Sequence, residues 1–260
     1  MRFGVCVSTL DEIEMLARAG YDFCELPARA VLPLEDNVAA LPAMRALDAA
    51  PLRAEAFNLL VPGDLPLCGP AVDLGALRIY LRRAFSRMAH LGAQAVVLGS
   101  GAARRIPAGY PRAAALDQLA DALALAADEA SRVGIDLALE HLNRGECNVF
   151  TTLAESQAFI AERGLAHLHL LADLYHLEVE HESFASVTAA APLLAHVHVA
   201  GGGRGAPTVG GYDNAGFMTT LRAVGYNRRI SAECRWDSLP DQAAATLAFM
   251  RAQWAAGTTA

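Results

Sequence analysis

Short apolar segments of β character alternate with longer helical segments along the whole sequence, and this alternation constrains the fold more than any other feature. The predicted strands are residues 2–8, 22–26, 53–57, 95–98, 136–140, 168–173, 194–199 and 229–233. Ala- and Leu-rich stretches with helical spacing lie between them, such as residues 73–91, 116–133 and 153–162. Eight such repeats, without a change of composition that would mark a linker, predict the α/β class and a single (β/α)8 TIM barrel.

Five glycines stand where a helix must end before the next strand begins. They are Gly20, Gly92, Gly134, Gly164 and Gly225, and each precedes a predicted strand by a few residues. Glycine is the usual residue at the C-terminal end of a helix, because it adopts the left-handed conformation without steric cost. The glycines therefore predict where several of the helices stop.

A doubly wound open sheet is the competing architecture. A nucleotide-binding sheet of that kind would carry a Gly-rich turn after its first strand. Here the turn reads Ser8-Thr9-Leu10-Asp11, without a glycine. At 260 residues the chain fits one large barrel, so we expect a single TIM-barrel domain over residues 1–254 and a short flexible C-terminal tail over residues 255–260.

Charge and cysteine content exclude several classes of protein. The 21 basic and 28 acidic residues give a net charge of -7, which argues against nucleic acid as a partner. No apolar run approaches the ~18 residues of a membrane span, and the N-terminus reads as a strand, not a signal peptide. The five cysteines are scattered and form no CxxC pair, as expected of reduced thiols. We expect a cytoplasmic protein that binds neither nucleic acid nor membrane.

The most informative stretch is residues 135–146, which reads IDLALEHLNRGE. It begins as a buried strand and ends in a carboxylate, Glu140, followed by polar residues that include Glu146. Parallel α/β folds place their chemistry at the C-terminal ends of their strands. Glu140 is therefore a candidate functional residue.

Four consecutive predicted strands end in a side chain that can bind a metal. These side chains are Glu140, Asp173, His198 and Glu233, separated by roughly one βα unit each. Strand ends that are distant in sequence lie side by side at one rim of a closed barrel. Three carboxylates and one imidazole suit Mn²⁺ first, with Mg²⁺, Co²⁺ or Zn²⁺ as alternatives. The pattern predicts one divalent-cation site.

Each of these residues also has a purely structural interpretation. Asp173 could cap the next helix. His196 and His198 point to the same side of their strand, and we favour His196 as a core histidine. Glu233 could pair with the neighbouring Arg235. The coincidence of four such residues on consecutive strand ends favours the metal site.

Two long loops follow predicted strand ends, at residues 58–70 and 99–111. Loops at this end of a barrel build substrate contacts. Arg104 and Arg105 in the second loop could hold an anionic group or pack the loop.

The segments LALEHLNRGE, LLADLYH, HVHVAGGGR and ISAECRW resemble the xylose-isomerase-like TIM-barrel superfamily. The similarity is greatest to its sugar isomerase/epimerase branch, which includes ketose 3-epimerases and hydroxypyruvate isomerase. DFCELP and the loop FNLLVPGDLPLCGP fit the same branch, so the resemblance covers most of the chain.

The resemblance implies a role for each matching residue. It implies that Glu140, Asp173, His198 and Glu233 bind one divalent cation, and that Glu140 and Glu233 exchange the proton of a substrate carbon. It also implies substrate contacts by the residues that match the remaining motif positions, namely Glu146, His176 and Arg204. The chain departs from the pattern after the ligand histidine, where the epimerases carry an acidic residue and this sequence reads Ala200-Gly201-Gly202-Gly203.

The function expected from these observations is a divalent-metal-dependent isomerase or epimerase of a sugar or small hydroxy-carbonyl compound, working through a metal-stabilised enediolate. The alternatives are an inosose-dehydratase-like lyase acting on a cyclic polyol ketone and a sugar-binding barrel without activity. A DNA-repair endonuclease of the same superfamily would need more histidines and a basic groove. Self-association into a homo-oligomer is a further expectation, because the helix surfaces are rich in Ala and Leu.

Overall fold

The computed structural model describes residues 1–256 and shows a closed barrel of eight parallel strands in the order β1-β2-β3-β4-β5-β6-β7-β8. The strands are β1 Arg2–Cys6, β2 Phe23–Pro27, β3 Ala54–Asn58, β4 Ala95–Leu98, β5 Asp136–Glu140, β6 Leu168–Asp173, β7 Leu194–Val199 and β8 Arg229–Ala232. Pairing of β1 with β8 closes the ring. The predicted (β/α)8 TIM barrel is confirmed.

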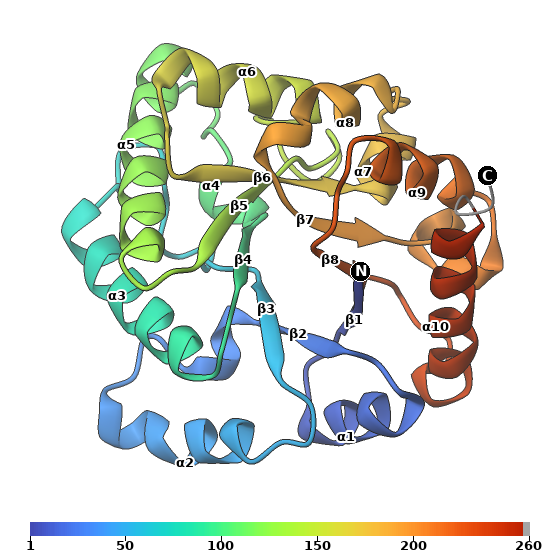
Figure 1. Ribbon diagram of the computed structural model, residues 1–260. Coiled ribbons are helices and arrows are strands. Elements are labelled where there is room, and N and C mark those ends of the chain that lie inside the picture. The colour runs from blue at the N-terminus through green and yellow to red at the C-terminus, as the bar shows by residue number, and fades with distance from the viewer. Residues whose placement is uncertain (257–260) are drawn as a thin grey trace.

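Helices connect the strands and surround the barrel (Figure 1). The α-helices are α1 Leu10–Ala19, α2 Asn37–Asp48, α3 Leu74–His90, α4 Gly101–Arg104, α5 Arg112–Ser131, α6 Leu153–Arg163, α7 Leu174–Val179, α8 Ala185–Ala190, α9 Asn214–Ala223 and α10 Leu239–Ala255. Short 3-10 helices cover Ala28–Val31, Ala191–Leu193, Gly202–Arg204 and Pro207–Val209. In Figure 1 the helices follow one another around the ring, and α10 packs against α1 to complete it.

The five glycines predicted to end helices all adopt the left-handed conformation. Their φ angles are 85° at Gly20, 90° at Gly92, 75° at Gly134, 63° at Gly164 and 73° at Gly225. At α1 a capping box complements the C-terminal glycine, because Glu12 and Thr9 bond each other's backbone N–H groups. Local sequence thus sets both ends of this helix.

Four strands have the predicted bounds and four differ by one or two residues at an end. The largest difference is in β1, which was predicted to reach Ser8 and ends at Cys6. Val7 still donates a hydrogen bond to the Glu25 carbonyl, at 2.9 Å. The N–H of Ser8 instead donates to the carboxylate of Glu12, at 2.8 Å, so the chain has already turned toward α1.

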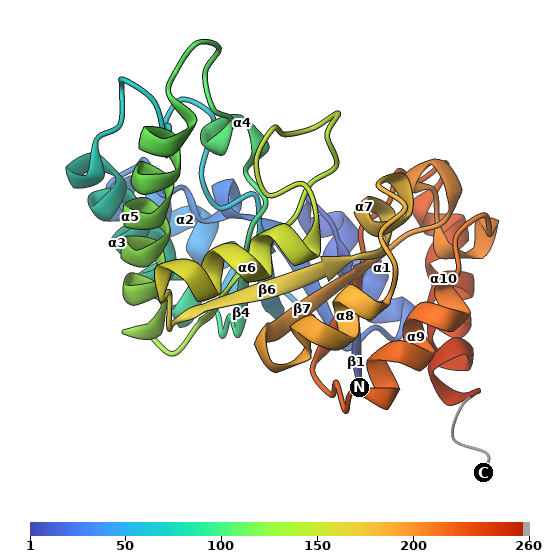
Figure 2. The same ribbon diagram turned by 90° about the horizontal axis from the view of Figure 1, so that it is seen from above.

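The two ends of the barrel differ in chemistry. At the N-terminal end, Glu55 on β3 accepts hydrogen bonds from Arg2 on β1, at 3.0 Å, and from Arg229 on β8, at 2.7 Å. These ion pairs lie at the face of the barrel that serves stability. Figure 2 shows α4, α7 and the loop before α6 at the opposite end, away from the N-terminus.

The predicted division into a domain of residues 1–254 and a tail of residues 255–260 stays a prediction. Helix α10 continues to Ala255, and residues 257–260 lie outside the described residues. Within residues 1–256, no helix is long and apolar enough to cross a membrane. The expected cytoplasmic location and self-association stay predictions.

Candidate active site

Four polar side chains converge at the C-terminal rim of β5 to β8. Glu140 and Asp173 are the last residues of β5 and β6, His198 is next to last in β7, and Glu233 directly follows β8. One ligand atom from each lies within 4.8 Å of the others. The backbone N–H of Glu233 bonds the Val199 carbonyl at 3.1 Å, so strand pairing fixes this residue too. The structure brings together all four residues that the sequence predicted as metal ligands.

His198 lies between the carboxylates with one ring nitrogen facing them. Its Nδ1 atom is 3.3 Å from Glu140 Oε1 and 3.3 Å from Glu233 Oε2. Its Nε2 atom is 2.9 Å from Oε1 of Glu25, a β2 residue on another part of the barrel wall. The ring therefore has one nitrogen directed into the cluster and the other held beneath it.

Asp173 both caps a helix and faces the cluster. Oδ1 accepts a hydrogen bond from the Tyr175 N–H at 2.8 Å, which is the capping role that the sequence allowed. Oδ2 is buried and has no hydrogen-bond partner among residues 1–256. Burial, together with repulsion from Glu140 and Glu233, raises the pKa of Asp173 to about 8. A cation among these oxygens would relieve both the missing contact and the repulsion.

The two glutamates have different environments. Burial raises the pKa of Glu140 and the Glu233 charge raises it further, whereas the neighbouring His198 acts to lower it. For Glu233, burial acts upward, but His198 and Arg204 lower the pKa to about 2. Such divergence between two carboxyl groups is typical of acid–base sites.

Arg204 connects the cluster to Glu146. Its Nη2 is 2.5 Å from Glu233 Oε2, its Nη1 is 3.2 Å from Glu146 Oε1, and its guanidinium lies 4.6 Å from the ring centre of Tyr175. Glu233 therefore pairs with Arg204, and no ion pair between Glu233 and the neighbouring Arg235 is found in the described part of the chain.

The glycine run before Arg204 forms a tight turn that directs this side chain. The N–H of Gly201 bonds the Gly205 carbonyl at 2.8 Å, and that of Gly202 bonds the Gly210 carbonyl at 2.6 Å. A Cβ atom on Gly201 would lie 2.4 Å from the Ala206 carbonyl oxygen. The backbone passes too close here for any side chain, so Gly201 must be glycine in this turn.

His176, in the first turn of α7, lies against Asp173. Its Nδ1 accepts a hydrogen bond from the Asn143 N–H at 3.0 Å, which leaves the proton of the neutral ring on Nε2. Nε2 is 3.5 Å from Asp173 Oδ2. Burial lowers the pKa of His176 strongly, so the ring is neutral. Of the three predicted substrate contacts, His176 and Arg204 thus lie directly against the carboxylate cluster, and Glu146 is joined to it through Arg204.

A layer of side chains lies directly below the cluster. Two residues before each candidate ligand, strand alternation places the side chains of Ala138, Leu171, His196 and Ser231 on the same inward face. Ala138 and Leu171 belong to one small apolar cluster. His196 and Ser231 form the polar half, with 3.3 Å between Ser231 Oγ and His196 Nε2.

Glu25 completes this polar half, and the sequence did not reveal it. Its Oε2 is 2.7 Å from His196 Nε2, and all side-chain atoms of Glu25, His196 and His198 are inaccessible to solvent. Burial alone would raise its pKa, but His198 and His196 hold the pKa of Glu25 well below its ordinary value. The favoured interpretation of His196 as a core histidine agrees with its burial and with this hydrogen bond.

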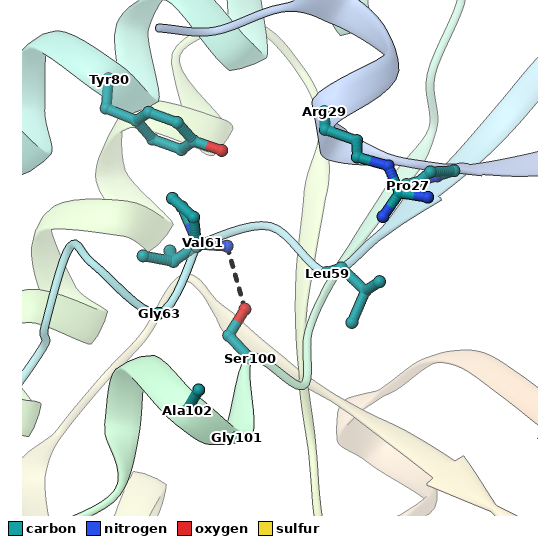
Figure 3. A pocket seen from close by; sticks show the side chains of 10 residues that line it. Pro27, Arg29, Leu59, Val61, Gly63, Tyr80, Ser100, Gly101 and Ala102 are labelled. Atoms are coloured by element: carbon teal, nitrogen blue, oxygen red, sulfur yellow. Dashed lines mark hydrogen bonds between the residues drawn. The ribbon is translucent and has the colours of Figure 1, made fainter. Parts of the chain in front are cut away.

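A cavity of about 290 Å³ opens between the loops after β2, β3 and β4 (Figure 3). Its walls include Leu59, Val61 and Tyr80, with Arg29 at the edge and Ser100 Oγ accepting a hydrogen bond from the Val61 N–H at 2.9 Å. Gly99 directly precedes the lining residue Ser100 and lies against Glu140. A Cβ atom there would lie 2.1 Å from Glu140 Oε2.

The long loops at residues 58–70 and 99–111 form much of this cavity, but their two arginines do not face it. Arg104 is fully buried and donates to the Leu98 carbonyl at 3.1 Å. Arg105 donates to the Glu146 carbonyl at 2.7 Å. Both arginines pack the loop, and Arg105 also supports the segment that carries Glu146.

Comparison with known proteins identifies sugar epimerases as relatives. The chain is 32% identical over 247 residues to L-ribulose 3-epimerase of Methylomonas sp. (strain DH-1). The aligned residues cover 92% of this chain and 82% of that protein. It is 30% identical over 162 residues to 3-dehydro-D-guloside 4-epimerase of Escherichia coli (strain K12), covering 60% of this chain and 62% of that enzyme. These relatives confirm the predicted enzyme class, an isomerase of the epimerase type.

The fold also matches solved structures over nearly its whole length. A crystal structure of D-psicose 3-epimerase in the presence of D-fructose superposes with a TM-score of 0.84 at 20% identity, over 98% of this chain and 99% of that chain. A family model described as a xylose isomerase-like TIM barrel matches residues 13–253. Fold, site geometry and sequence similarity therefore agree, and the chain belongs to the xylose isomerase-like TIM-barrel family.

Proposed function

We propose that this protein is a divalent-metal-dependent epimerase of a small ketose, in which Glu140 and Glu233 move the proton of one substrate carbon. The observation that carries the proposal is the convergence of Glu140, Asp173, His198 and Glu233 within 4.8 Å. The epimerase names of the relatives support a ketose as the substrate class.

The residues of the cluster fit a divalent cation. Three carboxylates and one imidazole nitrogen form a hard, oxygen-rich donor set, and the unpartnered Oδ2 of Asp173 lies within it. We expect Mn²⁺ first, with Mg²⁺, Co²⁺ or Zn²⁺ as alternatives. When bound, the cation would supply Lewis-acid stabilisation of negative charge that develops on substrate oxygens.

Proton transfer is assigned to the two glutamates. They stand at the ends of β5 and β8, which are separated by β6 and β7, so they reach the substrate from different directions. The ion pair with Arg204 keeps Glu233 ionised and able to accept a proton. Return of a proton by Glu140 to the opposite face of the same carbon gives the epimer.

Three further side chains would position the substrate. The carboxylate of Glu146 can accept a hydrogen bond from a hydroxyl group, whereas Arg204 can donate one. The Nε2–H of His176 can donate to a substrate oxygen beside Asp173, because Asn143 already occupies Nδ1. We place the carbons that do not react toward the cavity beside Gly99, whose volume of about 290 Å³ suits a small sugar.

The test follows hydrogen exchange at the reacting carbon. Wild-type protein loaded with Mn²⁺ should incorporate solvent deuterium into at least one compound of a panel that holds the ketoses D-fructose, D-psicose and L-ribulose and the hydroxy-carbonyl compound hydroxypyruvate. Glu140→Gln and Glu233→Gln should each slow this exchange by roughly 10²–10⁴-fold, the usual contribution of general acid–base catalysis. Mass spectrometry of the recovered sugar measures the exchange.

Glu129→Gln is a matched control, because Glu129 is a buried glutamate that pairs with Arg82 between α5 and α3. This variant should exchange at the wild-type rate. Undiminished exchange in both active-site variants would refute the assignment. Loss of water from the product would instead indicate a lyase, and sugar binding without any exchange would indicate a barrel that only binds.

A further inference from the structure

We propose that Glu25 is a positioning residue for the cation site, because its carboxylate fixes His198 with Nε2 protonated and Nδ1 free to bind the metal. This inference rests on the proposed metal-dependent function and assigns a part in it to a residue on β2, which β8 and β1 separate from the His198 strand β7. Glu25 itself contacts neither the cation position nor the substrate, since it lies in the layer below.

The contacts of Glu25 use both of its carboxylate oxygens. Oε1 is 2.9 Å from His198 Nε2, and Oε2 is 2.7 Å from His196 Nε2. The three side chains are fully buried, and the two histidines are 171 and 173 residues away in the sequence. Two short hydrogen bonds in a solvent-free interior hold both rings in one orientation.

The chemistry of the groups then dictates where the protons lie. An ionised carboxylate has only acceptor atoms, so each facing imidazole nitrogen must donate. His198 therefore carries a proton on Nε2. In a neutral ring Nδ1 then has a free lone pair, and Nδ1 is the atom that lies 3.3 Å from both Glu140 and Glu233. A carboxylate behind a ligand histidine also increases the basicity of the ligating nitrogen.

His196 makes Glu25 more than a simple partner of His198. Because Oε2 is engaged by His196, the carboxylate cannot rotate to release Oε1 without breaking a second buried hydrogen bond. The Nδ1 atom of His196 has no hydrogen-bond partner in the described range 1–256. The shortest hydrogen bond of His196 is thus the one at 2.7 Å that holds Glu25, and Glu25 in turn orients His198.

An alternative is that Glu25 is itself a metal ligand. Cys6, Glu25 and His198 also offer ligand atoms within 4.8 Å of one another. In that arrangement the Nε2 atom of His198 would have to lose its proton, and the protein would bind two ions on the two sides of one imidazole. The number of ions bound separates this arrangement from the positioning role.

The experiment measures Mn²⁺ binding by isothermal titration calorimetry, with circular dichroism as the check of folding. Wild-type protein should bind one equivalent. Glu25→Gln should weaken binding by about 10–100-fold, because the amide places a donor against one of the two Nε2–H groups. Glu25→Leu, which removes both acceptors, should weaken binding at least as much. Glu129→Gln, a buried glutamate remote from the cluster, should keep wild-type affinity.

A second measurement does not depend on how the variants fold. In ¹⁵N-labelled wild-type protein loaded with Zn²⁺, histidine NMR should show His198 protonated at Nε2 and unprotonated at Nδ1. If Glu25 only filled space in the core, it would not determine which ring nitrogen of His198 carries the proton. A proton on Nδ1 of the metal-loaded protein would overturn the inference.

The other outcomes separate the inference from the proposed function. Wild-type binding of one equivalent, with unchanged affinity in Glu25→Gln and Glu25→Leu, would overturn the positioning role alone. Two equivalents in wild type, with one lost in Cys6→Ala, would also overturn it, since Glu25 would then be a ligand. A wild-type protein that binds no divalent cation would overturn the proposed function and this inference with it.

Discussion

Gly99 shows how tightly the residues around Glu140 are packed. A Cβ atom on Gly99 would lie 2.1 Å from Glu140 Oε2, a separation that real atoms do not allow. The backbone conformation of Gly99 is not left-handed, so the requirement for glycine comes from this close approach alone. The absence of a side chain is what permits the Glu140 carboxylate to lie where it does.

We therefore expect Gly99→Ala to displace the Glu140 carboxylate. Affinity for Mn²⁺ should fall about 10-fold or more, and deuterium exchange into the ketose should fall with it. Calorimetry and mass spectrometry measure the two effects. The control is Gly75→Ala, whose Cβ atom would meet only Asp73 Oδ1, at 3.2 Å, in helix α3. Wild-type affinity in Gly99→Ala would contradict the packing argument.

The sequence predicted some residues of the site and missed others for physical reasons. Glu140 and Asp173 could be found because each ends a strand, and the closed barrel brings strand ends together whatever their sequence distance. Glu25 lies inside a strand. Its partners are side chains of another strand that meet it inside the barrel. The alternation of inward and outward residues along a single strand does not tell which side chains meet there. Arg204 required a family resemblance, because only the folded glycine turn directs it to Glu233.

At the scale of elements, helix α6 shows how a distant segment can fix a helix end. Thr152 Oγ1 accepts a hydrogen bond from the N–H of Glu155 at 3.0 Å. The carboxylate of Glu182, from the segment between α7 and α8, accepts from the N–H groups of Leu153 and Ala154, at 2.8 and 3.0 Å. Three of the four N–H groups left free at a helix start thus have partners.

Removal of either cap should destabilise the protein measurably. We expect Thr152→Ala and Glu182→Ala each to lower the free energy of unfolding by about 1 kcal/mol, because each leaves helix N–H groups without a partner. The double variant should show roughly the sum, since the two side chains bond different N–H groups. Urea denaturation followed by circular dichroism measures these values. Stability equal to wild type in the double variant would show that water replaces both caps.

The elements also show which boundaries can be read from sequence. The glycines that end α1 and α6 were predicted, because the left-handed conformation is a property of one residue. The Thr152 cap is visible in the same way. The Glu182 cap is not, because it depends on a segment that only the folded chain brings near. The early end of β1 has a local cause, since the Ser8 N–H bonds Glu12 four residues later, but the apolar pattern of the strand does not show it.

At the scale of the whole molecule, the proposed cation would join four adjacent strands. Its ligands stand on β5, β6 and β7 and directly after β8, so one ion would link half of the barrel wall. A ligand that binds only the folded protein stabilises it according to its concentration and affinity. Metal binding should therefore be visible in the thermal stability of the entire domain.

The pH dependence of this stabilisation follows from Asp173. Burial and the charges of Glu140 and Glu233 raise its pKa to about 8 in the metal-free protein. An aspartate in the unfolded chain has a pKa near ~3.9, so between these two values the folded protein holds a proton that the unfolded chain has lost. The contribution of Asp173 to stability is thus fully present below about pH 4 and is lost as the pH rises toward 8. A cation must displace that proton, so its affinity changes in the opposite direction.

We therefore expect Mn²⁺ to raise the melting temperature more at about pH 8.5 than at about pH 6. At 100-fold excess over the dissociation constant the stabilisation is about 2.7 kcal/mol, or roughly 5–10 °C for a domain of this size. Differential scanning fluorimetry with Mn²⁺ and with a chelator, at both pH values, measures the shift. Metal-free wild-type protein should become less stable between about pH 6 and about pH 8.5, because Asp173 loses its proton. Asp173→Asn has no proton to lose at this position, so the stability of its metal-free form should not show this decrease. Equal shifts at both pH values in wild type would mean that Asp173 is already ionised without the metal, and the missing partner of its Oδ2 atom would then need another explanation.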